Sequence, residues 1–299
     1  MSELPEDAYP VLRVSVEYFM RGIDLLGQLQ GDNLIRGMIF AAIWNANRVT
    51  GIESQKAIES PDGARRPVSV RELSRIVNMP YETVRRHVQP LLRERQCVKT
   101  EDGFIVPQTV LSRGPTAKVL RKCYANTIRL LNDLERIGFV TCPAETGRLD
   151  RDDDDGLSDV AYAIVNVGNE VLLRAVKTMG EFWDGDIIKG LVFNAIWTAN
   201  IKHITNASDV ALRAVISDRD RKPVSVLAIA NSLRLPYETT RRHANALVRQ
   251  RVCMRISGQG LIVPAEYHRG AADMTTAVYN LVVDFITSLQ QVGIEIERV

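Results

Sequence analysis

The chain has 299 residues, 45% of them hydrophobic, and a formal net charge of +2 at pH 7. This composition is typical of a globular protein and supplies enough apolar residues for two cores. No apolar run is long enough to span a membrane, and the acidic N-terminus lacks the charge pattern of a signal peptide. The four cysteines are scattered without metal-ligand spacing, which argues against a structural zinc site and favours a reducing, cytoplasmic location.

Two helices are predicted near the N-terminus, over residues 11–29 and 33–49. The second helix, which includes Trp44, is apolar on several sides, so it should be buried on several sides. The polar segment that follows, residues 50–66, carries turn-forming residues and is expected to be a loop.

A short helix, a turn, a second helix and a β-hairpin are predicted between residues 68 and 107. Ser69 is placed to cap the first helix, with Glu72 three residues later to complete a capping box. Pro80 suits the first turn of the second helix, because its missing N–H leaves no hydrogen bond unmade there. Two short apolar runs around Glu101-Asp102-Gly103 then predict the hairpin.

Residues 108–113 are expected to be a connector, followed by a long amphipathic helix over residues 116–137 that ends at Gly138. Residues 142–159 contain a run of aspartates and are expected to link two domains. Like charges repel and resist packing, so a solvated tether is the favoured interpretation of this run. A mimic of DNA that shields basic helices is the alternative.

The second half of the chain repeats the pattern of the first. The eight residues from Pro80 to His87 recur from Pro236 to His243 with seven identities, at an offset of 156 (236 − 80). Trp197 aligns with Trp44 at a slightly different offset, 153 (197 − 44). The remaining predicted elements of this half are helices over residues 160–183, 186–203 and 271–292 and a hairpin over residues 253–263. An internal repeat therefore covers most of the chain.

Both copies resemble winged helix-turn-helix transcriptional regulators of the broad MarR and GntR-like group. The resemblance rests on Thr83-Val84, on Arg86-His87, and on Leu91 followed by an apolar hairpin. Pro80-Tyr81 departs from the pattern of the group, where small polar residues are common, and this leaves the base preference open. The resemblance implies a mainly α fold with small β-hairpin wings, built as two winged helix-turn-helix domains with pseudo-two-fold symmetry.

The two domains are expected at residues 1–145 and 159–299, joined by an acidic linker over residues 146–158. The resemblance implies a sequence-specific, cytoplasmic DNA-binding transcriptional regulator, in which one chain supplies recognition helices to two consecutive major grooves. Double-stranded DNA is the expected partner and no cofactor is expected, while a small-molecule effector and further homodimerisation stay open. Rival functions are an architectural or replication-type DNA-binding protein and a winged-helix protein–protein scaffold. An enzyme is the least expected class, because the sequence has no Gly-rich phosphate loop, His-centred triad or metal cluster.

A helix in the major groove reads base edges from residues near its N-terminus, while flanking cations hold phosphates. Charged helix faces are common, but an Arg-Arg pair at the start of the second helix, in both copies, favours DNA contact over a solvated face. The predicted DNA-binding residues are Tyr81, Glu82, Arg85, Arg86, Arg93, Lys99, Tyr237, Glu238, Arg241, Arg242, Arg249 and Arg255. Further phosphate contacts are expected from Arg65-Arg66 and Arg221-Lys222, which precede the two helix pairs. His87 and His243 are expected to be partly buried spacers.

Trp44 and Asn47, with Trp197 and Asn200 in the second copy, form a candidate ligand pocket. A core tryptophan with a nearby amide cap is the alternative interpretation. It is the favoured one, because large aromatic side chains at helical spacing usually pack in a core.

Overall fold

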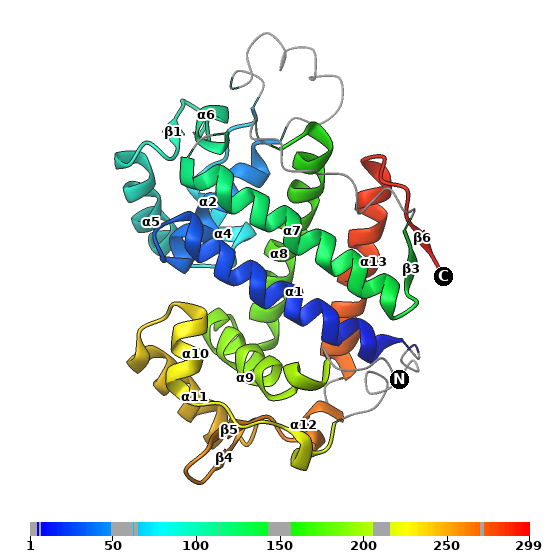
Figure 1. Cartoon of the computed structure of the whole chain (residues 1–299). Helices are drawn as coiled ribbons and strands as arrows, with labels where there is room; N and C mark the ends of the chain where they lie inside the picture. The colour runs from blue at the N-terminus through cyan, green and yellow to red at the C-terminus, as the bar shows by residue number, and fades with distance from the viewer. Residues whose placement is uncertain are drawn as a thin grey trace.

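The computed structural model describes residues 5, 7–48, 62, 65–112, 114–142, 157–205, 216–269 and 272–299. It is mainly helical, with small antiparallel strand pairs (Figure 1). The first half contains α1 (Ala8–Leu29), α2 (Leu34–Ala46), α4 (Val70–Ile76), α5 (Tyr81–Arg93), β1 (Val98–Lys99), β2 (Phe104–Ile105), α6 (Gln108–Leu111), α7 (Gly114–Arg136) and β3 (Val140–Thr141). The second half contains α8 (Asp159–Phe182), α9 (Ile187–Thr205), the 3-10 helix η4 (Asp218–Asp220), α10 (Val226–Leu233), α11 (Tyr237–Arg249), β4 (Met254–Ile256), β5 (Gly260–Ile262), α12 (Ala265–Arg269), α13 (Ala272–Gln291) and β6 (Glu297–Arg298).

Four long helices, α1, α7, α8 and α13, lie at the centre of the fold (Figure 1). α1 packs against α7 and α13, and α8 packs against the same two helices. The Tyr18 hydroxyl on α1 donates a hydrogen bond to the carbonyl of Gly168 on α8 at 3.0 Å. β3 also pairs with β6, which aligns Val140 with Arg298. The two halves of the sequence are therefore joined by helix packing and by a strand pair.

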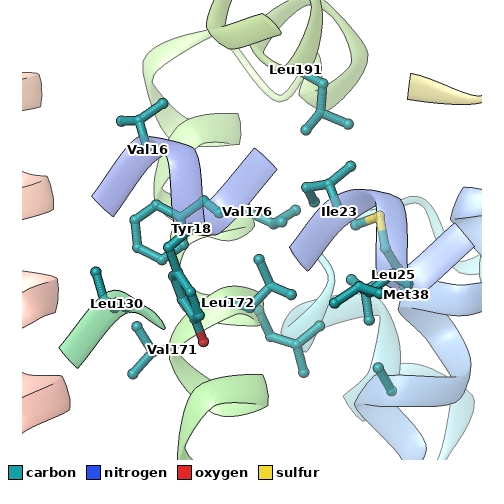
Figure 2. Packing of buried hydrophobic residues seen from close by; sticks show 14 of the residues in the cluster. Val16, Tyr18, Ile23, Leu25, Met38, Leu130, Val171, Leu172, Val176 and Leu191 are labelled. Carbon is teal, nitrogen blue, oxygen red and sulfur yellow. The ribbon is translucent and has the colours of Figure 1, made fainter. Parts of the chain in front are cut away.

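The buried apolar side chains form one continuous cluster that draws on both halves of the chain. Figure 2 shows side chains of α1, α7, α8 and α9 in this cluster, among them Tyr18, Leu130, Leu172 and Leu191. Full burial of one large aliphatic or aromatic side chain contributes about 1.5–3 kcal/mol. This cluster, more than the two- and three-residue strands, therefore stabilises the fold.

α2 passes close to α1 because Gly37 has no side chain. A Cβ atom at this position would lie 1.8 Å from the carbonyl oxygen of Leu26. At Gly190, the aligned position in α9, a Cβ atom would instead meet two side chains, Met179 at 2.6 Å and Trp183 at 2.7 Å. Side chains can shift more readily than the main chain of α1, which cannot move without displacing the helix, so only glycine fits at residue 37.

A helix pair followed by a strand pair occurs twice, in residues 68–106 (the N-terminal module) and residues 224–263 (the C-terminal module). Ser69 caps α4 by accepting a hydrogen bond from the N–H of Glu72 at 3.2 Å, which confirms the predicted N-cap. The side chain of Glu72 pairs with Arg66 at 2.6 Å, however, so it does not close the predicted capping box.

Each module also contains a strand bridge that the sequence did not predict. Val68 bridges to Phe104 just before α4, and Val224 bridges to Leu261 just before α10. The N–H of Phe104 donates to the Val68 carbonyl at 2.9 Å, and the N–H of Leu261 donates to the Val224 carbonyl at 2.8 Å. Each hairpin is therefore tied to the segment that leads into its own helix pair.

Several predicted boundaries need correction or lie outside the described residues. The connector predicted at residues 108–113 is wrong in part, because Gln108–Leu111 form α6, where Asp62 accepts a hydrogen bond from the Gln108 N–H at 2.8 Å. The predicted acidic linker lies outside the described residues except at its last two positions, where Ser158 caps α8. Among the helices described, none combines the length and the apolar character that crossing a membrane requires.

Candidate nucleic-acid interface

α5 turns one apolar face toward the core and a charged face toward solvent. Val84, Val88 and Leu91 are fully buried, and their spacing of four and three residues places them on one stripe of the helix. Pro80 precedes the first turn as the N-cap, and Tyr81 beside it is 48% exposed. The N-terminal end of α5 is therefore accessible to a large partner.

α11 has the same arrangement. Thr240, Ala244 and Leu247 are buried, while Tyr237 at the N-terminal end is 46% exposed. In the view of Figure 1, α5 and α11 both lie toward the left-hand margin of the molecule. All the residues predicted to contact DNA are exposed, namely Tyr81, Glu82, Arg85, Arg86, Arg93, Lys99, Tyr237, Glu238, Arg241, Arg242, Arg249 and Arg255.

The arginine nearest the start of each helix forms an ion pair with the glutamate one turn before it. Arg85 Nη2 lies 2.8 Å from Glu82 Oε2, and Arg241 Nη2 lies 2.7 Å from Glu238 Oε2. Exposed ion pairs of this kind contribute only about 0–1 kcal/mol. A phosphate or a guanine edge can therefore replace the carboxylate at little cost, and the glutamate meanwhile holds the guanidinium over the helix.

A hollow of about 440 Å³ lies on the surface of α11. Its lining residues are Glu238, Thr239, Arg241, Arg242, Asn245 and Arg249. Arg255 in β4 donates a hydrogen bond to Asn245 Oδ1 at 3.1 Å, so this cation of the β4–β5 hairpin lies against the same helix. Guanidinium groups gathered around one hollow are suited to binding phosphate oxygens or the acceptors of a guanine.

The two histidines that close the repeated octapeptide are partly or largely buried, as predicted. Burial lowers the pKa of His87, and the positive charges of Arg86 and Arg36 lower it further. Burial also lowers the pKa of His243, although Asp186, whose carboxylate lies 3.3 Å from the His243 ring, acts in the opposite direction. Burial therefore favours the neutral form of both histidines.

The basic residues that precede each helix pair do not all face solvent. The side chain of Arg221 is 1% exposed and donates a hydrogen bond to the Ile216 carbonyl at 3.1 Å, so the predicted phosphate contact is wrong for this residue. Arg65 is also largely buried, and it pairs with Asp62 at 3.1 Å. Arg66 and Lys222 are exposed and stay candidates for phosphate contact.

Asn47 and Asn200 are fully buried, and both use their amide groups to hold the hairpins. Asn47 donates to the carbonyls of Arg66 at 2.7 Å and Phe104 at 3.0 Å, and its oxygen accepts from the Val106 N–H at 2.8 Å. Asn200 makes the equivalent set of hydrogen bonds in the second half, with Lys222, Leu261 and Val263 at 2.8, 3.0 and 2.9 Å. These two amides therefore have a structural role, because each holds its hairpin in place by hydrogen bonds.

Trp44 and Trp197 are core residues, each 4% exposed. Trp44 borders a cavity of about 20 Å³ and Trp197 borders an apolar cavity of about 70 Å³, and neither Asn47 nor Asn200 lines these cavities. The structure therefore agrees with the favoured interpretation, a tryptophan packed in the core with a buried amide nearby, and does not support a pocket that a tryptophan and an asparagine share.

Four further exposed arginines lie on the modules and were missed from the sequence. Arg71 and Arg75 lie on α4, and Arg95 and Arg251 follow α5 and α11. Arg95 and Arg251 have positive φ angles of 55° and 59°, a conformation that is uncommon for a residue with a side chain. The signal in the sequence was an arginine, in both copies, where a helix usually ends in glycine.

No cluster of histidine, cysteine or carboxylate side chains suited to a metal ion occurs among the residues that the structure describes. The chemistry that the modules offer is therefore cationic and hydrogen-bonding. Comparison with known protein families, with curated proteins and with solved structures finds no match to this chain.

Proposed function

We propose that the chain is a sequence-specific DNA-binding transcriptional regulator, built from two winged helix-turn-helix modules that act as an intramolecular pseudo-dimer. One observation carries the proposal. The repeated eight-residue stretch begins α5 and α11, and in both helices its arginines and tyrosine are exposed while its fifth residue, Val84 or Thr240, is buried.

In this proposal α5 and α11 enter major grooves with their N-terminal ends. Tyr81, Glu82 and Arg85 reach base edges, and Arg86 and Arg93 hold phosphates. The equivalent residues of α11 act in the same way, and Lys99 and Arg255 on the wings contact the backbone of the DNA. The buried amides of Asn47 and Asn200 support this proposal, because they fix each hairpin relative to the helix that precedes its module, α2 or α9.

The two half-sites should be similar in sequence, because the octapeptides differ only at Val84 and Thr240. A pseudo-two-fold arrangement of the modules would place the half-sites about one turn of DNA apart, ~34 Å. The four central helices and the β3–β6 pair supply a rigid support for such spacing.

The test begins with selection of bound sequences from a random DNA pool, followed by mobility shifts on the selected site. Arg85→Ala combined with Arg241→Ala should weaken specific binding by several kcal/mol, because each base contact is worth about 1–3 kcal/mol. Arg174→Ala combined with Lys177→Ala is the control, since it removes the same charge from exposed positions on α8. Equal losses in both double variants would contradict base recognition by α5 and α11. Absence of any selected sequence would point to the scaffold function instead.

A further inference from the structure

A groove of about 780 Å³ lies between α1, α7, α9 and α10. Much of its wall is apolar, with Met20, Leu25 and Ile229 among the lining side chains. Arg21, Lys122, Arg129 and Lys202 also line it, against the two carboxylates of Glu17 and Asp24. Asp24 is already paired with Arg234, whose Nε lies 2.6 Å from its Oδ1. The groove therefore combines an apolar wall with an excess of positive charge.

Arg21 and Arg129, two of the cations in this groove, are only partly satisfied by the described residues. Arg21 donates to Asn126 at 2.7 Å and to Glu17 at 2.9 Å, but its Nη2 is buried without a hydrogen-bond partner among those residues. Thr198 Oγ1 is likewise buried without a partner among them. Arg129, with a side chain that is 51% exposed, lies 3.9 Å from the carboxylates of Glu17 and Asp133, separations longer than a charge-assisted hydrogen bond. Lys122 donates a hydrogen bond to Gln28 Oε1 at 2.8 Å.

The guanidinium groups of Arg21 and Arg129 are close enough for their positive charges to repel each other. Burial lowers the pKa of Arg21, and the positive charge of Arg129 is the next cause in size. A buried hydrogen-bond donor without a partner costs about 1–3 kcal/mol. An anion at this place would accept from Arg21 and would reduce the repulsion between Arg21 and Arg129.

The corresponding positions in the other half of the chain do not carry this excess. With the halves aligned on Tyr124 and Tyr279, Lys122 corresponds to Ala277 and Arg129 corresponds to Asp284. The carboxylate of Asp284 forms an ion pair with Arg174, the residue aligned with Arg21. The positive charge of Arg174 is neutralised within the protein, so the two halves differ in charge at these aligned positions.

We propose that the groove between α1, α7, α9 and α10 is a binding site, one per chain, for a small organic anion with an apolar body. Arg21, Lys122 and Arg129 hold the anionic head group, and Met20, Leu25 and Ile229 contact the apolar body. The proposal does not depend on DNA binding, because the site lies on the long helices and on the face of α10 turned toward them.

The test is a calorimetric titration of the full chain, without DNA, using 2-naphthoate as the anion and 2-naphthylmethanol as its neutral counterpart. We expect one naphthoate per chain, bound at least about tenfold more tightly than the alcohol, because charge-assisted hydrogen bonds form only with the carboxylate. Lys122→Ala combined with Arg129→Ala should remove that difference. Both side chains are exposed, so the variant should remain folded, and thermal unfolding checks this.

Arg174→Ala combined with Lys177→Ala is the matched control, since it removes two exposed cations from α8 that do not line the groove. This variant should bind naphthoate within about twofold of the unmodified chain, as expected for charges distant from the site. Three results would each overturn the site: no binding of naphthoate at millimolar concentration, equal affinity for acid and alcohol, or the same loss in the control. If the Lys122 and Arg129 variant unfolds, Arg129→Gln alone carries the test with the same expected direction.

Discussion

Asn47, at the C-cap of α2, donates a hydrogen bond to the carbonyl of Phe104 in β2 at 3.0 Å. The two residues are 57 positions apart in the sequence. The same amide oxygen accepts from Val106, and all these groups are buried. One side chain thus holds the hairpin of the N-terminal module against α2, and Asn200 holds the hairpin of the C-terminal module against α9.

Asn47→Ala should destabilise the chain. The substitution leaves the buried Val106 N–H without its partner, and it removes one hydrogen bond each from the carbonyls of Phe104 and Arg66, of which Phe104 still accepts from the Val68 N–H at 3.1 Å. A buried polar group left without a partner costs about 1–3 kcal/mol. Urea unfolding monitored by circular dichroism would measure the change. Asn45→Ala on the same helix is the control, because Asn45 Oδ1 has no hydrogen-bond partner among the described residues and its loss should cost much less. Equal stability of the Asn47 and Asn45 variants would contradict the role of Asn47 in holding the hairpin.

Gly37→Ala and Gly190→Ala test how closely the helices approach in the two halves. At Gly37 the new methyl group would overlap the main chain of α1, 1.8 Å from the Leu26 oxygen. Overpacking of this kind typically costs about 1–3 kcal/mol and occasionally more. At Gly190 the nearest atoms belong to side chains, those of Met179 and Trp183, and not to the main chain, so the cost should be smaller. Thermal unfolding of both variants under one condition would compare their melting temperatures, and a lower value for Gly190→Ala than for Gly37→Ala would contradict the prediction.

Local elements were largely predictable from the sequence, because their signals are local. Ser69 caps α4 as predicted, and Gly138 follows the last turn of α7 with a φ of +75°. The exposed face of α5 also followed from the spacing of its apolar residues, since Val84, Val88 and Leu91 can lie on only one stripe.

Long-range features were not predictable in the same way. The partner of Asn47 lies in a different element, and the burial of Arg221 depends on how distant segments pack around it. The groove between α1, α7, α9 and α10 needs all four helices in place before its cationic side chains lie together. A single sequence shows which residues are cationic, but hydrophobic period alone does not show which cations share a surface.

The histidines predict a pH dependence of stability. Both pKa values are lowered in the folded chain, so the unfolded chain binds more protons as the pH falls through the usual value of 6.5. Their contribution is therefore fully present above that value, and it is lost as the pH falls toward the lower pKa of the folded state. His87→Gln combined with His243→Gln should flatten the decline in unfolding free energy between pH 7.5 and 5, a window set by the pKa of unperturbed histidine.

Asp186→Asn tests the contribution of His243 to this pH dependence separately. Asp186 raises the pKa of His243 against the effect of burial, so its removal should lower that pKa further. Asparagine can still accept the hydrogen bond from the Lys189 N–H, which Asp186 Oδ1 accepts at 2.9 Å. The variant should therefore show a steeper loss of stability with falling pH. A shallower loss would contradict the assignment of the pH dependence to His243.

Arg71 and Arg75 predict that the two modules hold the DNA backbone unequally. Both are exposed on α4, whereas the aligned residues of α10 are Leu227 and Asn231. In helix-turn-helix proteins the first helix crosses the DNA backbone, so these arginines are placed to contact phosphates. Each phosphate contact contributes about 0.9 to the slope of log K against log salt concentration. Arg71→Gln combined with Arg75→Gln should therefore reduce the slope by roughly 2 while the preferred sequence stays the same.

The reverse exchange completes this test on the other module. Leu227→Arg combined with Asn231→Arg should raise the slope by a similar amount, because it places two cations at the aligned positions of α10. Arg174→Gln combined with Lys177→Gln removes equal charge from α8 and should leave the slope unchanged. The α4 variant could keep the full slope although the unmodified chain binds its selected site. In that case the arginines of α4 do not contact phosphates, and the prediction that the two modules make unequal numbers of phosphate contacts is wrong, while the proposal of DNA binding is unaffected.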